Sequence, residues 1–257
     1  KNAYEGKFYD IVTVTVDDDL IQKNYHFEIE NTDDGLEYKS KIEKLQLLIN
    51  EGKLGEASQW QAGQMVAICF QKHLYQPLFA IDSDIECLKM RPLSFDVPSE
   101  ANFVKDLEAF YNAPISKPII GNRHLYLLRN ADTKSKGLGF ALAGNFYPDF
   151  LLWLVDNETG QQWLSFIDPK GLRQMNLSDP KLKLHKEVKL LQADLGDPNL
   201  TLNSFIISQT DYIDLLNVTV SQVELENENV LFQDSNQKYL TKMFKKMLET
   251  EQIIEKI

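Results

Sequence analysis

The stretch Phe146-Tyr147-Pro148-Asp149-Phe150-Leu151-Leu152-Trp153 is followed by Trp163-Leu164-Ser165-Phe166-Ile167-Asp168-Pro169-Lys170. Both are apolar runs rich in aromatic and aliphatic side chains, which is typical of strands in a sheet. The segment between them, Asp156-Asn157-Glu158-Thr159-Gly160, carries the residue types of a turn. We therefore predict a hairpin, with polar residues at the outer end of each arm.

The numbering of the hairpin predicts which residues face each other. Two paired antiparallel strands join residues whose numbers sum to a constant, and a turn at 157–160 makes that sum 317. Asp149 and Asp168 have the same sum, so we expect them opposite each other, with Cβ atoms about 4.5–5.5 Å apart. Because side chains alternate along a strand, Lys170 shares the face of Asp168.

Two carboxylates at that distance repel each other unless a cation lies between them. A hard divalent ion with oxygen ligands, Mg²⁺ first of all and Mn²⁺ as an alternative, would remove the repulsion. Lys170 could then hold an attacking water or stabilise the negative charge of a phosphoryl transition state. The residues thus predict a metal-dependent phosphodiesterase site.

A plainer interpretation has to be kept beside this one. An acidic residue two positions before a lysine also occurs at Asp179 and Glu187, so Asp168-Pro169-Lys170 alone could be a solvated salt bridge at a strand end. The hairpin register, the Pro-Asp start of the first arm and an upstream helix favour the site.

The upstream helix is predicted at 100–111, with Ser99 as its cap. Glu100 shares its apolar stripe with Phe103 and Leu107. Glu100 is therefore either a partner of the helix dipole or a site residue, with Glu108 as the fallback.

Composition bounds the class of protein. The 257 residues are 43% apolar, enough for one large domain or two modest ones. The net charge of −11 is unusual for a protein that binds nucleic acid by itself. However, Lys181, Lys183, Lys186 and Lys189 make one segment basic, either as phosphate contacts or as a solvated helix face.

The sequence also predicts the cellular compartment of the protein and whether the chain is part of a longer one. No apolar run reaches the length of a membrane span, and no secretory signal opens the chain. Cys69 and Cys87 are expected as reduced thiols, so the protein should be cytoplasmic and should have no membrane partner. Because the chain opens with Lys1, we expect it to be a piece of a longer protein.

The remaining pattern predicts an α/β fold with a mixed sheet flanked by helices. The predicted strands are 8–16, 24–30, 125–129, 139–143, 146–155, 162–167 and 201–208; the predicted helices are 38–52, 57–75, 179–193, 209–217 and 235–257; 88–98 is predicted as a connector. We divide the chain into an N-terminal α/β extension (1–89), a core that contains the hairpin (90–210) and a C-terminal helical extension (211–257). Trp153 and Trp163 are expected in the core, and the histidines lack the spacing of a zinc site.

A helical Glu100, Pro148-Asp149 and Asp168-Pro169-Lys170 together resemble the PD-(D/E)xK nuclease superfamily. Residues 99–173 more narrowly resemble the C-terminal endonuclease domain of type III restriction enzymes, in which a helicase precedes the nuclease. The resemblance implies a restriction-endonuclease-like core, with Asp149 and Asp168 as metal ligands and the Ile167 or Pro169 carbonyl as a further ligand. It also implies Lys170 as the catalytic lysine and Glu100 as a carboxylate that orders the metal or its water.

The implied function is Mg²⁺-dependent cleavage of DNA within a larger helicase–nuclease. Lys181, Lys183 and Lys186 would contact DNA, and the implied partners are the helicase/ATPase domain of the same parent chain and a methyltransferase or specificity subunit. The chain has no Gly-x-x-x-x-Gly-Lys-Ser/Thr loop, so an ATPase is expected outside it. The alternatives are a catalytically inactive nuclease-fold module that binds DNA or a partner, and a structural accessory without a nucleic-acid role.

Overall fold

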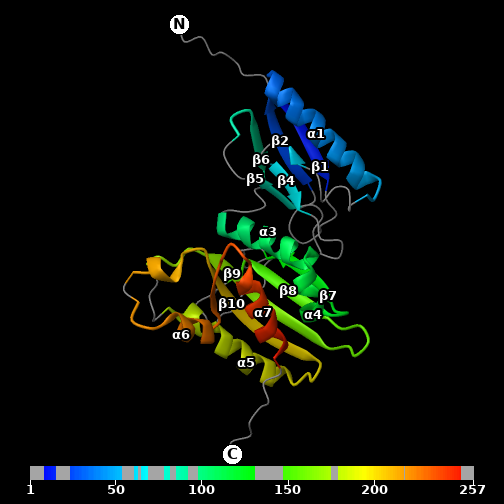
Figure 1. Cartoon of the computed structure of the whole chain (residues 1–257). Coiled ribbons are helices and arrows are strands. Elements are labelled where there is room, and N and C mark those ends of the chain that lie inside the picture. The colour runs from blue at the N-terminus through cyan, green and yellow to red at the C-terminus, as the bar shows by residue number, and fades with distance from the viewer. Residues whose placement is uncertain are drawn as a thin grey trace, which may run out of the picture. The chain divides into compact units, whose positions relative to one another are not determined.

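The protein is an α/β protein that divides into two compact units, Lys1–Ala101 and Asn102–Ile257, each described here by itself. Figure 1 shows the computed structural model. It describes residues 9–15, 24–53, 61–62, 65–68, 78–81, 85–91, 98–130, 147–174, 179–216 and 218–249. None of the helices formed by these residues is long and apolar enough to cross a membrane.

The described residues of the first unit form two small antiparallel sheets and one long helix. One sheet has the order β1-β2-β6 and the other the order β3-β4-β5. Their bounds are β1 Tyr9–Thr15, β2 Asn24–Glu30, β3 Gln61–Ala62, β4 Met65–Ile68, β5 Leu78–Ile81 and β6 Leu88–Arg91; the helix is α1, Asp33–Asn50. The predicted strands 8–16 and 24–30 are confirmed.

Helix α1 confirms the helix predicted at 38–52 but begins earlier in the chain. Thr32 caps its first turn, since its side chain accepts a hydrogen bond from the Gly35 N–H at 3.2 Å. Gly35 is required there, because a Cβ atom would lie 1.9 Å from the Glu30 carbonyl oxygen. Ile42 and Leu45 are fully buried, as is Phe27 of β2.

Two predictions in this unit were wrong. The segment 57–75 was predicted as a helix, but its described residues form β3 and β4, where Val66 and Ile68 are β-branched residues that favour strands. The segment 88–98 was predicted as a connector, but it begins with β6 and ends in a helix. In β6 the buried Leu88 and Met90 flank the exposed Lys89, which is the alternation of a half-buried strand.

The second unit is built on a five-stranded mixed sheet with the order β11-β10-β9-β8-β7. Its strands are β7 His124–Arg129, β8 Phe150–Val155, β9 Gln162–Lys170, β10 Leu200–Ser208 and β11 Val230–Phe232. Neighbours β7, β8 and β9 pair antiparallel, whereas β10 runs parallel to both β9 and β11. This confirms the strands predicted at 125–129, 162–167 and 201–208, and 139–143 lies outside the described residues.

Helices flank the sheet. They are α3 Pro98–Asn112, α4 Lys117–Ile120, α5 Leu184–Leu195, α6 Gln222–Asn227 and α7 Lys238–Leu248, with 3₁₀ turns η1 Pro114–Ser116, η2 Pro180–Lys183 and η3 Tyr212–Asp214. The helix predicted at 179–193 is η2 followed by α5. The helix predicted at 235–257 corresponds to α7 in the part of the chain that is described, and that predicted at 209–217 shortens to η3. Strand β11 and helix α6 were not predicted.

Helix α3 differs from the prediction at its start. It begins at Pro98, whose missing N–H costs nothing in a first turn, so Ser99 lies inside the helix and is not its cap. Phe103 and Leu107 of its predicted apolar stripe are fully buried. The ring centroid of Phe103 lies 5.5 Å from that of Phe150 in β8.

The two faces of the sheet carry different helices. On one face Leu151, Phe166 and Leu202 pack with Leu184 and Val188 of α5. Phe150 faces the other way, toward α3. Helices α3 and α7 are joined by the stacked rings of Phe110 and Phe244, with centroids 5.3 Å apart, and by the Tyr239 hydroxyl, which donates to Asp106 at 2.8 Å.

The predicted register of the hairpin is confirmed. Phe150 pairs with Ile167, and every further pair of β8 and β9 also sums to 317. The turn is fixed by Asp156, whose carboxylate accepts from the N–H groups of Glu158 and Thr159; these hydrogen bonds hold the pKa of Asp156 below its usual range. Gly160 closes the turn with a φ of 75°, a conformation that favours glycine. The first arm, however, begins as a strand at Phe150, residues 147–149 are not part of the strand, and Phe146 lies outside the described residues.

Candidate active site

The polar end of β9 carries the best-defined site residues. Asp168 and Lys170 share one face of the strand, as predicted, and their side chains form an ion pair with Nζ 2.5 Å from Oδ2. The two side chains are only 11% and 25% exposed. The strand end thus contains the salt bridge that the plainer interpretation predicts, and its two side chains are only partly exposed to water.

Pro169, between Asp168 and Lys170, fits a strand position because the ladder between β8 and β9 ends before it and needs no N–H from it. The Lys170 carbonyl accepts from the Gln209 N–H at 3.0 Å, so Lys170 turns its backbone groups toward the β10 side. Pro169, one residue earlier, turns its nitrogen to the opposite side. There the pairing with β8 has already ended at Ile167, and no ladder hydrogen bond is lost.

Asp149 lies immediately before β8 and is half-buried. Its carbonyl accepts from the Asn130 N–H at 2.7 Å, and the Asn130 side chain donates to the Pro148 carbonyl at 2.8 Å. These bonds hold the Pro-Asp segment against the end of β7. The β8–β9 ladder stops at Phe150 and Ile167, one pair short of Asp149 and Asp168.

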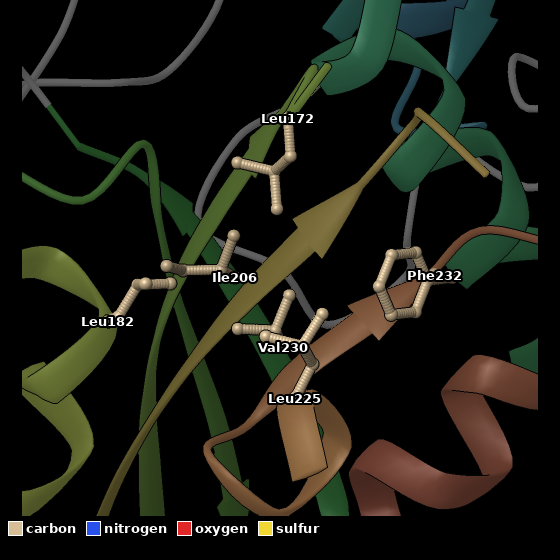
Figure 2. Packing of buried hydrophobic residues seen from close by; sticks show 6 residues of the cluster. All are labelled: Leu172, Leu182, Ile206, Leu225, Val230 and Phe232. Carbon is tan, nitrogen blue, oxygen red and sulfur yellow. The ribbon is translucent and has the colours of Figure 1, made fainter. Parts of the chain in front are cut away.

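A hollow of about 300 Å³ opens beside Lys170. It is lined by Lys170, Gly171, Leu172, Gln174, Asp179, Lys181, Leu182 and Ile206. The apolar residues among them belong to a buried cluster with Leu225, Val230 and Phe232, which Figure 2 shows gathered around β10 and β11. The hollow therefore combines apolar side chains with two lysines, one glutamine and one aspartate.

The three lysines predicted to contact DNA are not equivalent. Lys181 lines the hollow with Lys170, whereas Lys183 is exposed on the last residue of η2. The Lys186 ammonium lies 2.7 Å from the Glu228 carboxylate, and the Lys186 side chain is 59% exposed. All three follow Asp179, whose side chain caps η2 by accepting from the Lys181 N–H.

Glu100 is buried, with 4% of its surface exposed, in the first turn of α3. That agrees with the predicted inward orientation. Glu100 belongs to the first compact unit, which ends at Ala101, whereas Asp149, Asp168 and Lys170 belong to the second. Its approach to the hairpin carboxylates stays a prediction, as does the fallback role of Glu108, which is half-buried on the same helix.

The ligand chemistry can be compared with that of Mg²⁺. No group of three or more His, Cys, Asp or Glu residues suited to a metal occurs among the residues that the structure describes. Mg²⁺ keeps several waters and is often bound through one or two carboxylates, and its binding by Asp149, Asp168 and a main-chain carbonyl of Ile167 or Pro169 stays a prediction. Lys170 currently engages one Asp168 oxygen, and a metal there would compete with the ammonium.

Other predicted features are resolved by the structure. Trp163 is buried under the Arg123 guanidinium, 4.8 Å from the ring centroid, and Trp153 packs against the α5 cluster, so both tryptophans belong to the core as predicted. Cys87 is a free, half-buried thiol, and Cys69 lies outside the described residues.

Sequence reasoning missed Gln174 and Asp179 on the rim of the hollow. The Asp-Pro start of η2 was a readable signal for the second of these. Comparison of the chain with family models, with curated proteins and with solved structures gives no match. The function is therefore inferred from the positions of Asp149, Asp168 and Lys170 and from the residues that line the hollow.

Proposed function

We propose that the second unit is a metal-dependent endonuclease domain that cleaves DNA phosphodiester bonds, with a restriction-endonuclease-like PD-(D/E)xK core. The observation that carries this proposal is the β8–β9 register, which runs to within one pair of Asp149 and Asp168. The Asp168–Lys170 pair supports it, because a buried carboxylate paired with a partly buried lysine is uncommon for surface charge. The mixed sheet flanked by helices is the architecture that the resemblance implies.

Each residue then has a chemical role. Asp149 and Asp168 would hold Mg²⁺ or Mn²⁺ with a main-chain carbonyl of Ile167 or Pro169, and such an ion polarises a phosphodiester and lowers the pKa of a bound water. Lys170 exchanges its bond to Asp168 for one to the scissile phosphate and stabilises the charge that develops there. The resemblance implies that Glu100 orders the water or the ion, and this role stays a prediction because Glu100 belongs to the first unit.

The hollow provides the entry for substrate. Lys170 and Lys181 both line this small space, and Lys183 and Lys186 continue the basic segment along the chain. Phosphate contacts of this kind hold a nucleic acid in register without reading its sequence. The net charge of −11 fits a domain to which a helicase in the same parent chain delivers the DNA. A methyltransferase or specificity subunit completes the proposed assembly.

A second candidate is a catalytically inactive nuclease-fold module that binds DNA or a partner chain. Two observations favour it: the Lys170 ammonium bonds Asp168 directly, and the described residues contain no three-carboxylate cluster. In such a module the pair would be a buried structural bridge. The two candidates make opposite predictions about metal-dependent chemistry.

A plasmid-nicking assay separates them. Supercoiled DNA is incubated with the protein in Mg²⁺ and, in parallel, in EDTA. The endonuclease proposal predicts nicked and linear products in Mg²⁺ only. Intact plasmid under both conditions, together with measurable DNA binding, would identify the inactive module instead.

A further inference from the structure

The end of α6 and the turn that connects it to β11 form ion pairs with lysines from two different helices. Lys186 of α5 lies 2.7 Å from Glu228, and Lys242 of α7 lies 2.7 Å from Glu226. Next to them, the Lys246 ammonium donates to the Asn229 side-chain oxygen at 3.1 Å. Residues 226–229 therefore sit between the lysines of α5 and those of α7.

Two further basic residues act on Glu228. His185 lies 3.5 Å from its carboxylate, and the charge of Lys183 also lowers the pKa of Glu228. The bond from Lys186 is the main cause that lowers the pKa of Glu228. Burial lowers the pKa of His185, Glu228 opposes this effect, and Lys186 and Lys246 add to it. The Glu228 carboxylate thus interacts with two lysines and a histidine from η2 and α5.

The charge of these helices contrasts with that of the whole chain. Residues 181–189 and 238–246 contain eight lysines and one glutamate, although the chain carries a net charge of −11. The side chains of Lys186 and Lys242 are 59% and 50% exposed. Glu226 and Glu228 are the acidic side chains that interrupt this basic surface.

The basic surface lies close to the candidate active site. Asp168, Ile206 and Val230 are register partners across β9, β10 and β11, so Val230 is two strand spacings, about 10 Å, from Asp168. Glu228 and Asn229 directly precede Val230. At the other side, Ile206 lines the hollow that contains Lys170 and Lys181.

We infer that Lys183, Lys186, Lys242 and Lys246 form one phosphate-binding surface for duplex DNA that extends from the active site, and that Glu226 and Glu228 occupy two of these lysines until phosphate replaces them. The inference rests on the proposed endonuclease function and adds α7 to the DNA contacts. Its physical basis is exchange of partners, because a phosphate can take the ammonium bonds that the two carboxylates hold in the free protein.

The test measures duplex affinity by fluorescence anisotropy over a range of salt concentrations. Each lost phosphate contact lowers the slope of log K against log salt by about 0.9, so Lys242→Gln/Lys246→Gln should lower it by about 1.8. Glu228→Gln removes an internal competitor and should tighten binding about threefold at low salt. Lys44→Gln on α1, an exposed lysine outside this surface, is the matched control and should leave the slope unchanged.

Each outcome decides something. Wild-type binding and nicking with a control-like slope in Lys242→Gln/Lys246→Gln would overturn this inference and leave the endonuclease proposal standing. Weaker binding by folded Glu228→Gln would contradict the role of Glu228 as a competitor. Absence of both binding and nicking in the wild-type protein would overturn the endonuclease proposal and this inference with it.

Discussion

Two carboxylate–lysine pairs in the second unit have similar N–O distances but differ in exposure to water and in the elements that carry them. Asp168–Lys170 and Glu228–Lys186 have N–O distances of 2.5 and 2.7 Å. The first pair is 11% and 25% exposed on a central strand, and the second is 41% and 59% exposed between a turn and a helix. The comparison teaches that burial and rigid support, more than contact distance, distinguish a candidate site from surface charge.

The energetics of the two pairs should differ accordingly. An exposed pair contributes about 0–1 kcal/mol, since water solvates both charges well when they separate. A buried pair adds little net stability but is costly to break, because the remaining charge is left without a partner. A buried pair that is retained at that cost is a reasonable place to look for function.

The largest expected difference is in catalysis. Asp149→Asn, Asp168→Asn and Lys170→Met should each reduce Mg²⁺-dependent DNA cleavage by about 10²–10³ or more, because each removes a ligand or a charge-stabilising group. Lys186→Met is the matched control from the exposed pair and should retain cleavage when the DNA is saturating. Single-turnover nicking rates give the measurement. Cleavage by Asp168→Asn at the wild-type rate would erase the distinction between the pairs.

The next difference is in stability. Lys170→Met leaves the buried Asp168 carboxylate unpaired and should lower the free energy of unfolding by about 2 kcal/mol. Asp168→Asn should cost less, since Lys170 is the more exposed partner and can reach water. Urea unfolding of the two single variants and the double variant gives the coupling energy. A coupling near zero would mean that the pair is solvated after all.

The buried pair could be predicted from the sequence, because its position depends on residues that are close together in the chain. The turn residues Asp156 and Gly160 set the hairpin register, and that register with strand alternation was enough to put Lys170 on the face of Asp168. The apolar stripe of α3 was equally readable. These features depend on residues close together in the chain.

Other features depend on partners far away in the chain. β11 has only three residues, and its burial follows from parallel pairing with β10, so no local pattern announces it. The segment 57–75 contains apolar residues at helix-compatible spacing, yet β4 pairs with β5. Likewise, nothing in the sequence joins Lys186 to Glu228, which lie 42 positions apart.

A further carboxylate, the partly buried Asp106, differs from both pairs because its partner is a neutral hydroxyl. Burial raises the pKa of Asp106, and the pKa of Tyr239 is raised as well. The folded state then binds a proton on Asp106 more readily than the unfolded state, whose pKa is near 3.8. The contribution of Asp106 to stability should therefore decrease as pH rises from 3.8 through the raised value.

Two variants test this third pair. Asp106→Asn should flatten that decrease, as urea midpoints between about pH 4 and pH 7 would show. Tyr239→Phe should cost about 1 kcal/mol at neutral pH by removing the hydrogen bond. A pH profile of Asp106→Asn that matches wild type would mean that Asp106 is solvated like Glu228.

The smallest expected effect belongs to the exposed pair. Lys186→Met should change the free energy of unfolding by less than about 1 kcal/mol, and the change should shrink further in high salt. Thermal melts at low and high ionic strength provide the measurement. A larger, salt-independent loss would place Glu228–Lys186 in the same class as the buried pair.

The central claim is that Asp149 and Asp168 face each other and hold a divalent metal, and thermal melting with Mg²⁺ or EDTA tests it most directly. Saturating Mg²⁺ should stabilise the wild-type protein by about 2.7 kcal/mol at a hundredfold excess over the dissociation constant. Asp149→Asn relieves the repulsion, so in EDTA it should melt at the wild-type temperature or above, and it should lose the response to Mg²⁺. A variant that is strongly destabilised in EDTA, or that keeps the full Mg²⁺ response, would show that these carboxylates are structural and would contradict the account.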